Sequence, residues 1–148
     1  MPLKQAGIAL DSSCLVPLLC DWHEHYLRTT RAYQRCREQD TQIIIPAHSI
    51  LECYSVLTRL PAPFRFSPEP ARQLIEQNFS NAVTIVGTKA GMVWSLIENL
   101  ADRGIGGGRV YDALIAACAA EAGATVLLTW NVKHFAAIAP EGLAVREP

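Results

Sequence analysis

Short runs of Ile, Val and Leu alternate along the chain with longer segments in which apolar residues recur at helical spacing. We expect the short runs to be buried β-strands, at residues 8–10, 43–45, 83–86 and 126–128. The longer segments predict helices, at residues 12–19, 21–38, 47–60, 69–79, 89–102 and 109–122. Strands that alternate with helices form βαβ units, because parallel strands need crossover connections. The pattern therefore predicts an α/β fold with a central parallel β-sheet flanked by helices on both faces.

The same pattern fits one domain over residues 1–148. A chain of 148 residues that is 50% hydrophobic can bury one sizeable core but has no surplus for a second. The proline-rich stretch at residues 61–70, "PAPFRFSPEP", is expected to be a surface connection rather than a domain linker.

Charge and cysteine content exclude several classes of protein. A net charge of -1 gives no whole-molecule attraction to nucleic acid or to an anionic membrane, so any polyanion would bind at a local basic patch. The five cysteines are odd in number and form no CxxC pair, which indicates reduced thiols. No apolar stretch approaches the roughly 18 residues of a membrane span, and the N-terminal segment is too short for a signal peptide. We therefore expect a cytoplasmic protein without a membrane contact.

Four polar residues stand beside apolar elements. Asp11 follows the first predicted strand and Asn131 follows the last, so both belong at the carboxyl edge of the sheet, where ligands collect in such folds. Glu52 and Asp112 lie inside predicted helices that are otherwise apolar. The helix after Asp112 carries no charge through residue 120, so we expect it to be almost wholly buried and this carboxylate to need compensation.

Each of these residues also has an ordinary structural explanation. Asp112 suits the first turn of a helix and could pair with Arg109, three residues earlier. Asp11 could be an N-cap that accepts from the backbone N–H of residue 13 or 14. Glu52 alone fits a solvated helix position, and Asn131 alone fits a turn.

Taken together, the three acids favour a divalent cation. Clustered carboxylates repel one another unless a cation lies between them. Oxygen ligands without Cys or His select Mg²⁺ or Mn²⁺ over Zn²⁺, and such ions serve phosphoryl-oxygen chemistry. Zinc catalysis is disfavoured because the chain has no HExxH motif and no Cys/His ligand set.

The segments "IALDSSCLVPLL", "ILECYSVLTRLP" and "RVYDALIAACAAEAGATVLLTWNVKHF", in this order, resemble the PIN-domain ribonucleases, most closely the VapC toxins of type II toxin-antitoxin pairs. The resemblance spans nearly the whole chain. It implies that Asp11, Glu52 and Asp112 are the acidic metal-binding residues. Asn131 falls where many members have a fourth Asp, and Ser13 and Thr129 are placed to supply supporting hydroxyls.

The resemblance also implies an activity and partners. The activity is Mg²⁺- or Mn²⁺-dependent endoribonuclease cleavage by a metal-activated water that Asn131 orients. The partners are RNA, a cognate antitoxin that blocks the acidic groove, and a second copy of the chain in a homodimer. One alternative remains open, a catalytically weak PIN-like scaffold that binds protein or RNA. A phosphatase of the haloacid-dehalogenase type is disfavoured, because Ser13 stands where that class needs a second Asp as its general acid.

A basic stripe is the candidate RNA contact. Arg28, Arg31 and Arg35 fall at i, i+3 and i+7 of one predicted helix. A solvated helix face is the usual explanation of such a stripe. If the stripe is instead a track for phosphates that leads to the acids, further groups could extend it, namely Arg109, Lys133 and His134.

Overall fold

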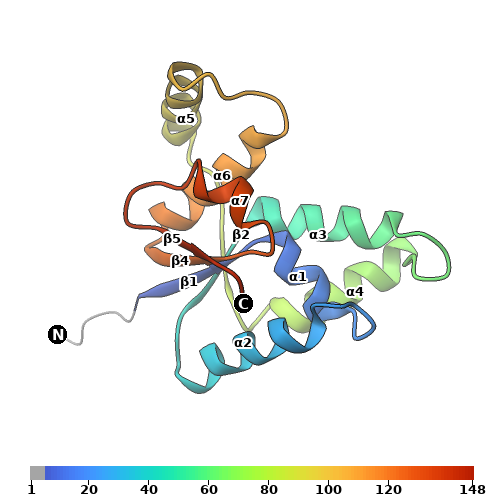
Figure 1. The fold of residues 1–148 in the computed structure, drawn as a ribbon. Helices are drawn as coiled ribbons and strands as arrows, with labels where there is room; N and C mark the ends of the chain where they lie inside the picture. Colours follow the sequence, from blue (N-terminus) through green and yellow to red (C-terminus); the bar gives the residue numbers. More distant parts are fainter. Residues whose placement is uncertain (1–5) are drawn as a thin grey trace.

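The computed structural model describes residues 6–148, and residues 1–5 of the predicted N-terminal segment lie outside the described residues. Within the described part, five strands form one parallel sheet in the order β3-β2-β1-β4-β5 (Figure 1). The strands are β1 (Gly7–Leu10), β2 (Ile43–Pro46), β3 (Thr84–Val86), β4 (Ala124–Leu128) and β5 (Ala144–Arg146). This sheet confirms the predicted α/β class.

Helices cover both faces of the sheet. They are α1 (Ser12–Leu19), α2 (Tyr26–Glu38), α3 (Ala47–Arg59), α4 (Pro68–Phe79), α5 (Ala90–Asp102), α6 (Arg109–Glu121) and α7 (Val132–Ala136). One core packs α1 to α4 against Ile43 and Ile45, and the other packs α6 and α7 against Ile44 and Leu127. The side chains of a buried strand alternate between faces, so the Ile run of β2 supplies both cores.

Three element assignments differ from the sequence-based prediction. The second long helix begins at Tyr26 rather than at residue 21, because residues 20–25 form successive turns in which His23 N–H donates to the carbonyl of Cys20. β5 and α7 were not predicted. β5 is only three residues long and α7 only five, and segments this short carry little periodicity.

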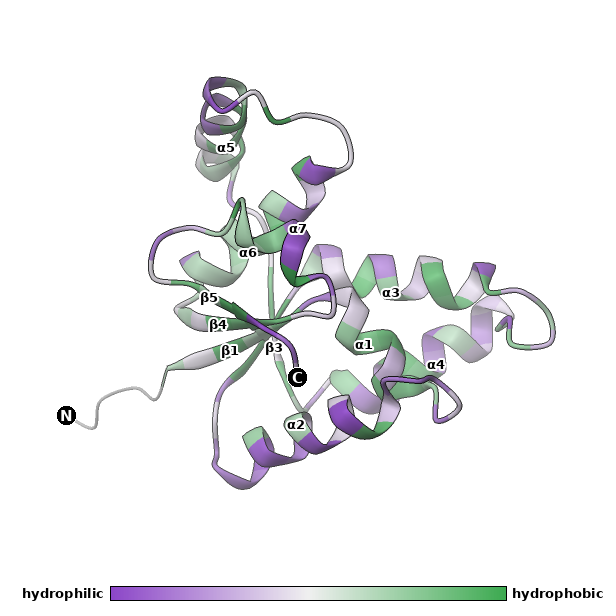
Figure 2. Cartoon of the chain, in the orientation of Figure 1, coloured by the Kyte–Doolittle hydropathy of each residue, from purple (hydrophilic) through white to green (hydrophobic). Residues whose placement is uncertain are grey.

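Helix α5 lies at the periphery of the molecule, where it packs against α6 (Figure 1). Leu100 is its one fully buried residue, whereas Trp94 is 73% exposed and Ile97 50% exposed. Figure 2 shows hydrophobic colour on this outlying helix, in contrast to the largely hydrophilic α2. In the described residues, no helix combines the length and the apolar character that crossing a membrane requires.

Candidate active site

Asp11 is a buried carboxylate at the carboxyl edge of the sheet. It is 2% exposed and is the N-cap of α1, where Oδ1 accepts from the backbone N–H of Ser12 at 2.6 Å. The hydroxyls of Ser13 and Thr129 each donate to Oδ2 at 2.8 Å. Thr129 reaches Asp11 because Leu10 of β1 pairs with Leu128 of β4, which places the two following residues side by side. The N-cap explanation is therefore correct, although the N–H donor belongs to Ser12 rather than to residue 13 or 14.

Glu52 is tied to Asp11 through Ser12. The Ser12 hydroxyl lies 2.7 Å from Glu52 Oε2 and 3.2 Å from Asp11 Oδ1. The other oxygen of Glu52 lies 3.2 Å from Nε2 of His48, one helical turn earlier on α3, and the ring of His48 stacks on Tyr111. The side chain of Glu52 is 34% exposed. Glu52 is therefore a partly buried, hydrogen-bonded group rather than a solvated one.

Asp112 lies in the first turn of α6 and is partly buried, and residues 113–120 that follow it are all buried or partly buried, as predicted. Its pKa is raised, first by burial and then by the negative charges of Asp11 and Glu52. His134 and Arg109 oppose this rise in the pKa with weaker effects. Among the described residues, Arg109 and Asp112 do not form an ion pair within 4.0 Å. The proposed pairing of these two residues therefore does not account for Asp112.

All four polar residues singled out in the sequence line one cavity of about 250 Å³, here called the acidic cavity. Its lining consists of Asp11, Ser12, Glu52, Ser55, Val56, Arg59, Asp112 and Asn131. The backbone N–H of Asn131 donates to the Thr129 hydroxyl at 2.9 Å, which fixes the start of the loop that carries the amide. Carboxylates from the end of β1, from α3 and from α6 thus meet at one edge of the sheet.

The donor chemistry of the acidic cavity suits a hard divalent cation, because three carboxylates and an amide line it and the charges of the three acids act on one another. The side chains are not gathered as ligands, however. In residues 6–148, no group of three or more His, Cys, Asp or Glu residues has the spacing to hold a metal ion. Hydrogen bonds explain this spacing for two of the acids, since Asp11 and Glu52 each have both oxygens engaged by protein donors.

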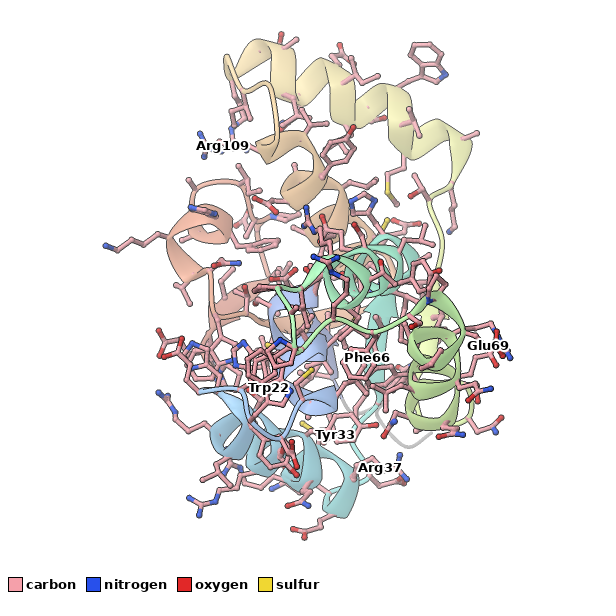
Figure 3. All side chains as sticks on the ribbon, turned by 90° about the vertical axis from the view of Figure 1, so that its right-hand side faces the viewer. Trp22, Tyr33, Arg37, Phe66, Glu69 and Arg109 are labelled. Atoms are coloured by element: carbon pink, nitrogen blue, oxygen red, sulfur yellow. The ribbon has the colours of Figure 1, made fainter. Side chains whose placement is uncertain are left out.

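The basic candidates fall into two groups. Arg109 and His134 act on the pKa of Asp112, and Lys133 is exposed in α7 beside His134. Arg28 lies over the Trp130 ring at 4.8 Å and bonds the Pro148 carbonyl. The other two arginines of the stripe, Arg31 and Arg35, are exposed and continue along α2 away from Trp130. In Figure 3 the far end of α2, marked by Arg37, lies in the lower half of the view, and the start of α6, marked by Arg109, lies in the upper part.

Sequence reasoning missed several residues of the site. Ser12 bridges two of the acids, and Ser55 and Arg59 line the acidic cavity. The spacing held a signal for the last two. Ser55 and Arg59 follow Glu52 by three and seven residues, so they share its face of α3.

The cysteines take no part in the acidic cavity. All five are free and buried, in agreement with the prediction of reduced thiols. Burial raises the pKa of Cys53 to about 12 and that of Cys20 to about 11, and burial together with the Asp11 charge raises the pKa of Cys14. Protonated, buried thiols are poor nucleophiles, so the cysteines are not candidate nucleophiles.

Comparison with known proteins identifies the family. A family model described as "PIN domain" matches residues 8–139. The chain belongs to the PIN-domain family. Two relatives within it are ribonucleases VapC40 and VapC27 of Mycobacterium tuberculosis. Each is 35% identical to this chain. The match with VapC40 covers 81% of this chain and 84% of VapC40, and the match with VapC27 covers 77% of both chains. The predicted resemblance is therefore confirmed.

Solved structures share this PIN fold at low identity. VapC20 of M. tuberculosis, described as a toxin that cleaves the sarcin-ricin loop, has a TM-score of 0.68 and 16% identity, and covers 91% of this chain and 98% of its own. DNA-bound VapBC of Salmonella typhimurium has a TM-score of 0.67 and 21% identity, over 97% of this chain and 98% of the other. FitAB bound to a DNA fragment has a TM-score of 0.69 and 16% identity, and the match covers 95% of this chain and 94% of the other chain.

Proposed function

We propose that this PIN-domain protein is a Mg²⁺- or Mn²⁺-dependent endoribonuclease and the toxin of a type II toxin-antitoxin pair. The observation that carries the proposal is the meeting of Asp11, Glu52, Asp112 and Asn131 in the acidic cavity. Relatives at 35% identity that are named ribonuclease VapC support RNA as the substrate.

Asp11, Glu52 and Asp112 would hold the divalent cation. When bound, such an ion neutralises charge that develops on a phosphate and lowers the pKa of a coordinated water. Each oxygen of Glu52 accepts one hydrogen bond, from Ser12 or from His48, and keeps a second lone pair for the cation. Ser13 and Thr129 keep Asp11 in place through its Oδ2, and the amide of Asn131 would orient the attacking water.

Positive groups around the acidic cavity would hold the RNA backbone. Arg109, Lys133 and His134 are the better placed, because two of them already act on the pKa of Asp112. Arg28 is close to Trp130 at the other side of the site. Arg31 and Arg35 would contact phosphates further along the strand.

An antitoxin and a second copy of the chain are the proposed protein partners. Solved relatives of the same fold include toxins crystallised as VapBC and FitAB assemblies, which supports an antitoxin that covers the acidic cavity. The exposed apolar side chains of α5, Trp94 and Ile97, support a homodimer.

Cation binding tests the proposed site directly. Isothermal titration of the purified chain with millimolar Mg²⁺ and with Mn²⁺ should give a saturable signal that Asp112→Asn abolishes. Glu121→Gln is the matched control, since it removes an exposed carboxylate from the same helix that pairs with Lys89 instead. Equal binding by the wild type and Asp112→Asn, or no binding at all, would overturn the metal site and favour a PIN scaffold that only binds its partners.

A further inference from the structure

A second cavity, of about 410 Å³, adjoins the acidic cavity. The two share Ser12, Val56 and Asn131 in their linings. The outer wall of the second cavity comes from the turns before α2 and includes His23 and His25. We call it the histidine cavity. It lies within the size range of small-ligand sites, about 300–1,000 Å³.

Aromatic rings line the histidine cavity. The rings of His25 and Trp130 are stacked, with centroids 3.7 Å apart and planes 6° apart, and Arg28 also lies over the Trp130 ring. A further ring would therefore stack on His25 rather than on Trp130. Trp130 is fixed in this orientation because its Nε1 donates to the buried hydroxyl of Thr29 at 2.9 Å. The ring of His23 lies 5.5 Å from that of His25 at a tilt of 39°.

His23 adds a hydrogen-bond donor. Its Nδ1 accepts the backbone N–H of His25 at 3.1 Å, which leaves the proton of the neutral ring on Nε2. Burial, followed by the neighbouring His25, lowers the pKa of His23, so the ring is neutral at pH 7. No residue of the described chain hydrogen-bonds to Nε2 of His23, which leaves this N–H to a ligand.

The charges of the histidine cavity argue against a phosphate. Among the described residues that line it, none is Lys or Arg, and Glu24 supplies the one acidic side chain. Aromatic surface, a neutral donor and a carboxylate acceptor are the groups that recognise an unpaired base, which stacks and forms hydrogen bonds through its edge. Because the histidine cavity shares three residues with the acidic cavity, a strand with a phosphate in the acidic cavity would bring its neighbouring nucleotide to the histidine cavity.

We infer that the histidine cavity binds an unpaired nucleobase of single-stranded RNA, next to the phosphate in the acidic cavity, and so selects the cleavage position. The inference rests on the proposed ribonuclease function, which supplies the phosphate. His23 and Glu24 would determine base specificity through hydrogen bonds to the base edge, since stacking alone tolerates any base.

The test is binding without cleavage. Fluorescently labelled octamers of A, C, G and U would be titrated by anisotropy against Asp112→Asn protein in EDTA, with and without His23→Asn. Asn retains an acceptor at the position of Nδ1 for the His25 N–H but removes the ring and Nε2. We expect the protein that retains His23 to bind one octamer more tightly than the other three. His23→Asn should lower the affinity for that octamer about tenfold, so that the four affinities become similar.

Leu27→Ala is the control, because Leu27 follows the same turns at the start of α2, is 63% exposed and does not line the histidine cavity. It should keep the preference. An unchanged preference in His23→Asn would overturn the inference and leave the nuclease proposal intact. The inference would also be overturned if His23→Asn lowered the affinity for a protein partner and left RNA binding unaffected. A base preference that depends on His23 in a chain that never cleaves RNA would support the base site and reject the nuclease.

Discussion

At the scale of single residues, hydroxyl groups hold Asp11 at the sheet edge. Thr129 is fully buried and donates to Oδ2 of Asp11, so Thr129→Val leaves a buried carboxylate with one donor fewer. We expect the free energy of unfolding to fall by about 1–3 kcal/mol, measured by urea denaturation. Thr30→Val is the matched control. The Thr30 hydroxyl is buried without a partner in the described structure, so its loss should be neutral or stabilising. Equal effects of the two changes would contradict this role of Thr129.

Asp112 gives a stability prediction that depends on pH. Its folded-state pKa is raised, so the folded chain binds a proton more tightly than the unfolded chain. Stability therefore falls as pH rises from the unfolded pKa through the folded one, and at neutral pH the ionised Asp112 destabilises the fold. In EDTA at pH 7, Asp112→Asn should unfold at a higher temperature than the wild type. This gain should shrink as pH falls toward the unfolded pKa, near 4. A lower unfolding temperature for Asp112→Asn at pH 7 would contradict the crowding of charge in the acidic cavity.

The sequence could identify the acids but not their hydrogen-bond partners. Asp11, Glu52 and Asp112 stood out because carboxylates are rare beside apolar elements. Ser12 did not stand out, since its bridge from Asp11 to Glu52 depends on how α1 packs against α3, a contact across 40 residues of sequence. The stack of His48 on Tyr111 likewise depends on α3 and α6 being neighbours.

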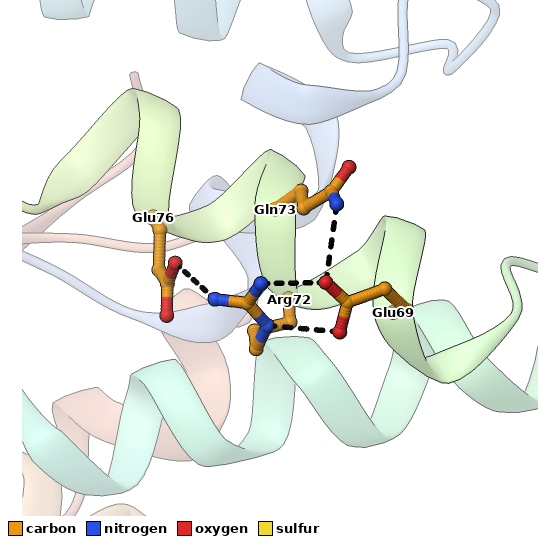
Figure 4. Close-up of polar contacts among 4 residues, drawn as sticks. All are labelled: Glu69, Arg72, Gln73 and Glu76. Atoms are coloured by element: carbon orange, nitrogen blue, oxygen red, sulfur yellow. Dashed lines mark hydrogen bonds and ion pairs between the residues drawn. The ribbon is translucent and has the colours of Figure 1, made fainter.

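At the scale of elements, α4 and α5 carry different surfaces. On α4, Arg72 is held between Glu69 and Glu76, with Gln73 also bonded to Glu69 (Figure 4). These side chains are exposed, so the network stabilises the fold little and indicates a solvated face. The exposed apolar residues of α5 have no such polar cover.

Helix α5 is therefore the element we expect at a dimer interface. Light scattering at tens of micromolar should report a dimer for the wild type and a monomer for the double variant Trp94→Asp, Ile97→Asp. Leu27→Asp is the control, because Leu27 is 63% exposed on α2 and away from α5. A monomeric wild type, or a dimer that survives both changes in α5, would remove α5 from the interface.

Element prediction succeeded where periodicity was long and failed where it was short. Helices α1, α3, α4, α5 and α6 begin and end within one residue of the predicted bounds. The start of α2 was misplaced because residues 21–25 are polar and aromatic, and nothing in their spacing distinguishes turns from a helix. β5 is an edge strand recognisable only by its pairing with β4.

At the scale of the whole molecule, parallel topology builds the acidic cavity. The adjacent strands β1 and β4 end at the same edge and bring Asp11 beside Thr129, while α3 and α6 carry Glu52 and Asp112 to that edge. Residues separated by as many as 120 positions therefore meet in one site. The α/β pattern predicted this edge, but only the strand order makes β1 and β4 neighbours.

The cleavage of RNA by the purified chain tests the central claim most directly. Total RNA would be incubated with wild type, Asp112→Asn and Glu121→Gln in Mn²⁺, in Mg²⁺ and in EDTA. We predict discrete fragments from the wild type and Glu121→Gln with either metal, and none in EDTA or from Asp112→Asn. Fragments that persist in EDTA or with Asp112→Asn, or intact RNA from a folded, antitoxin-free sample under every condition, would contradict the account.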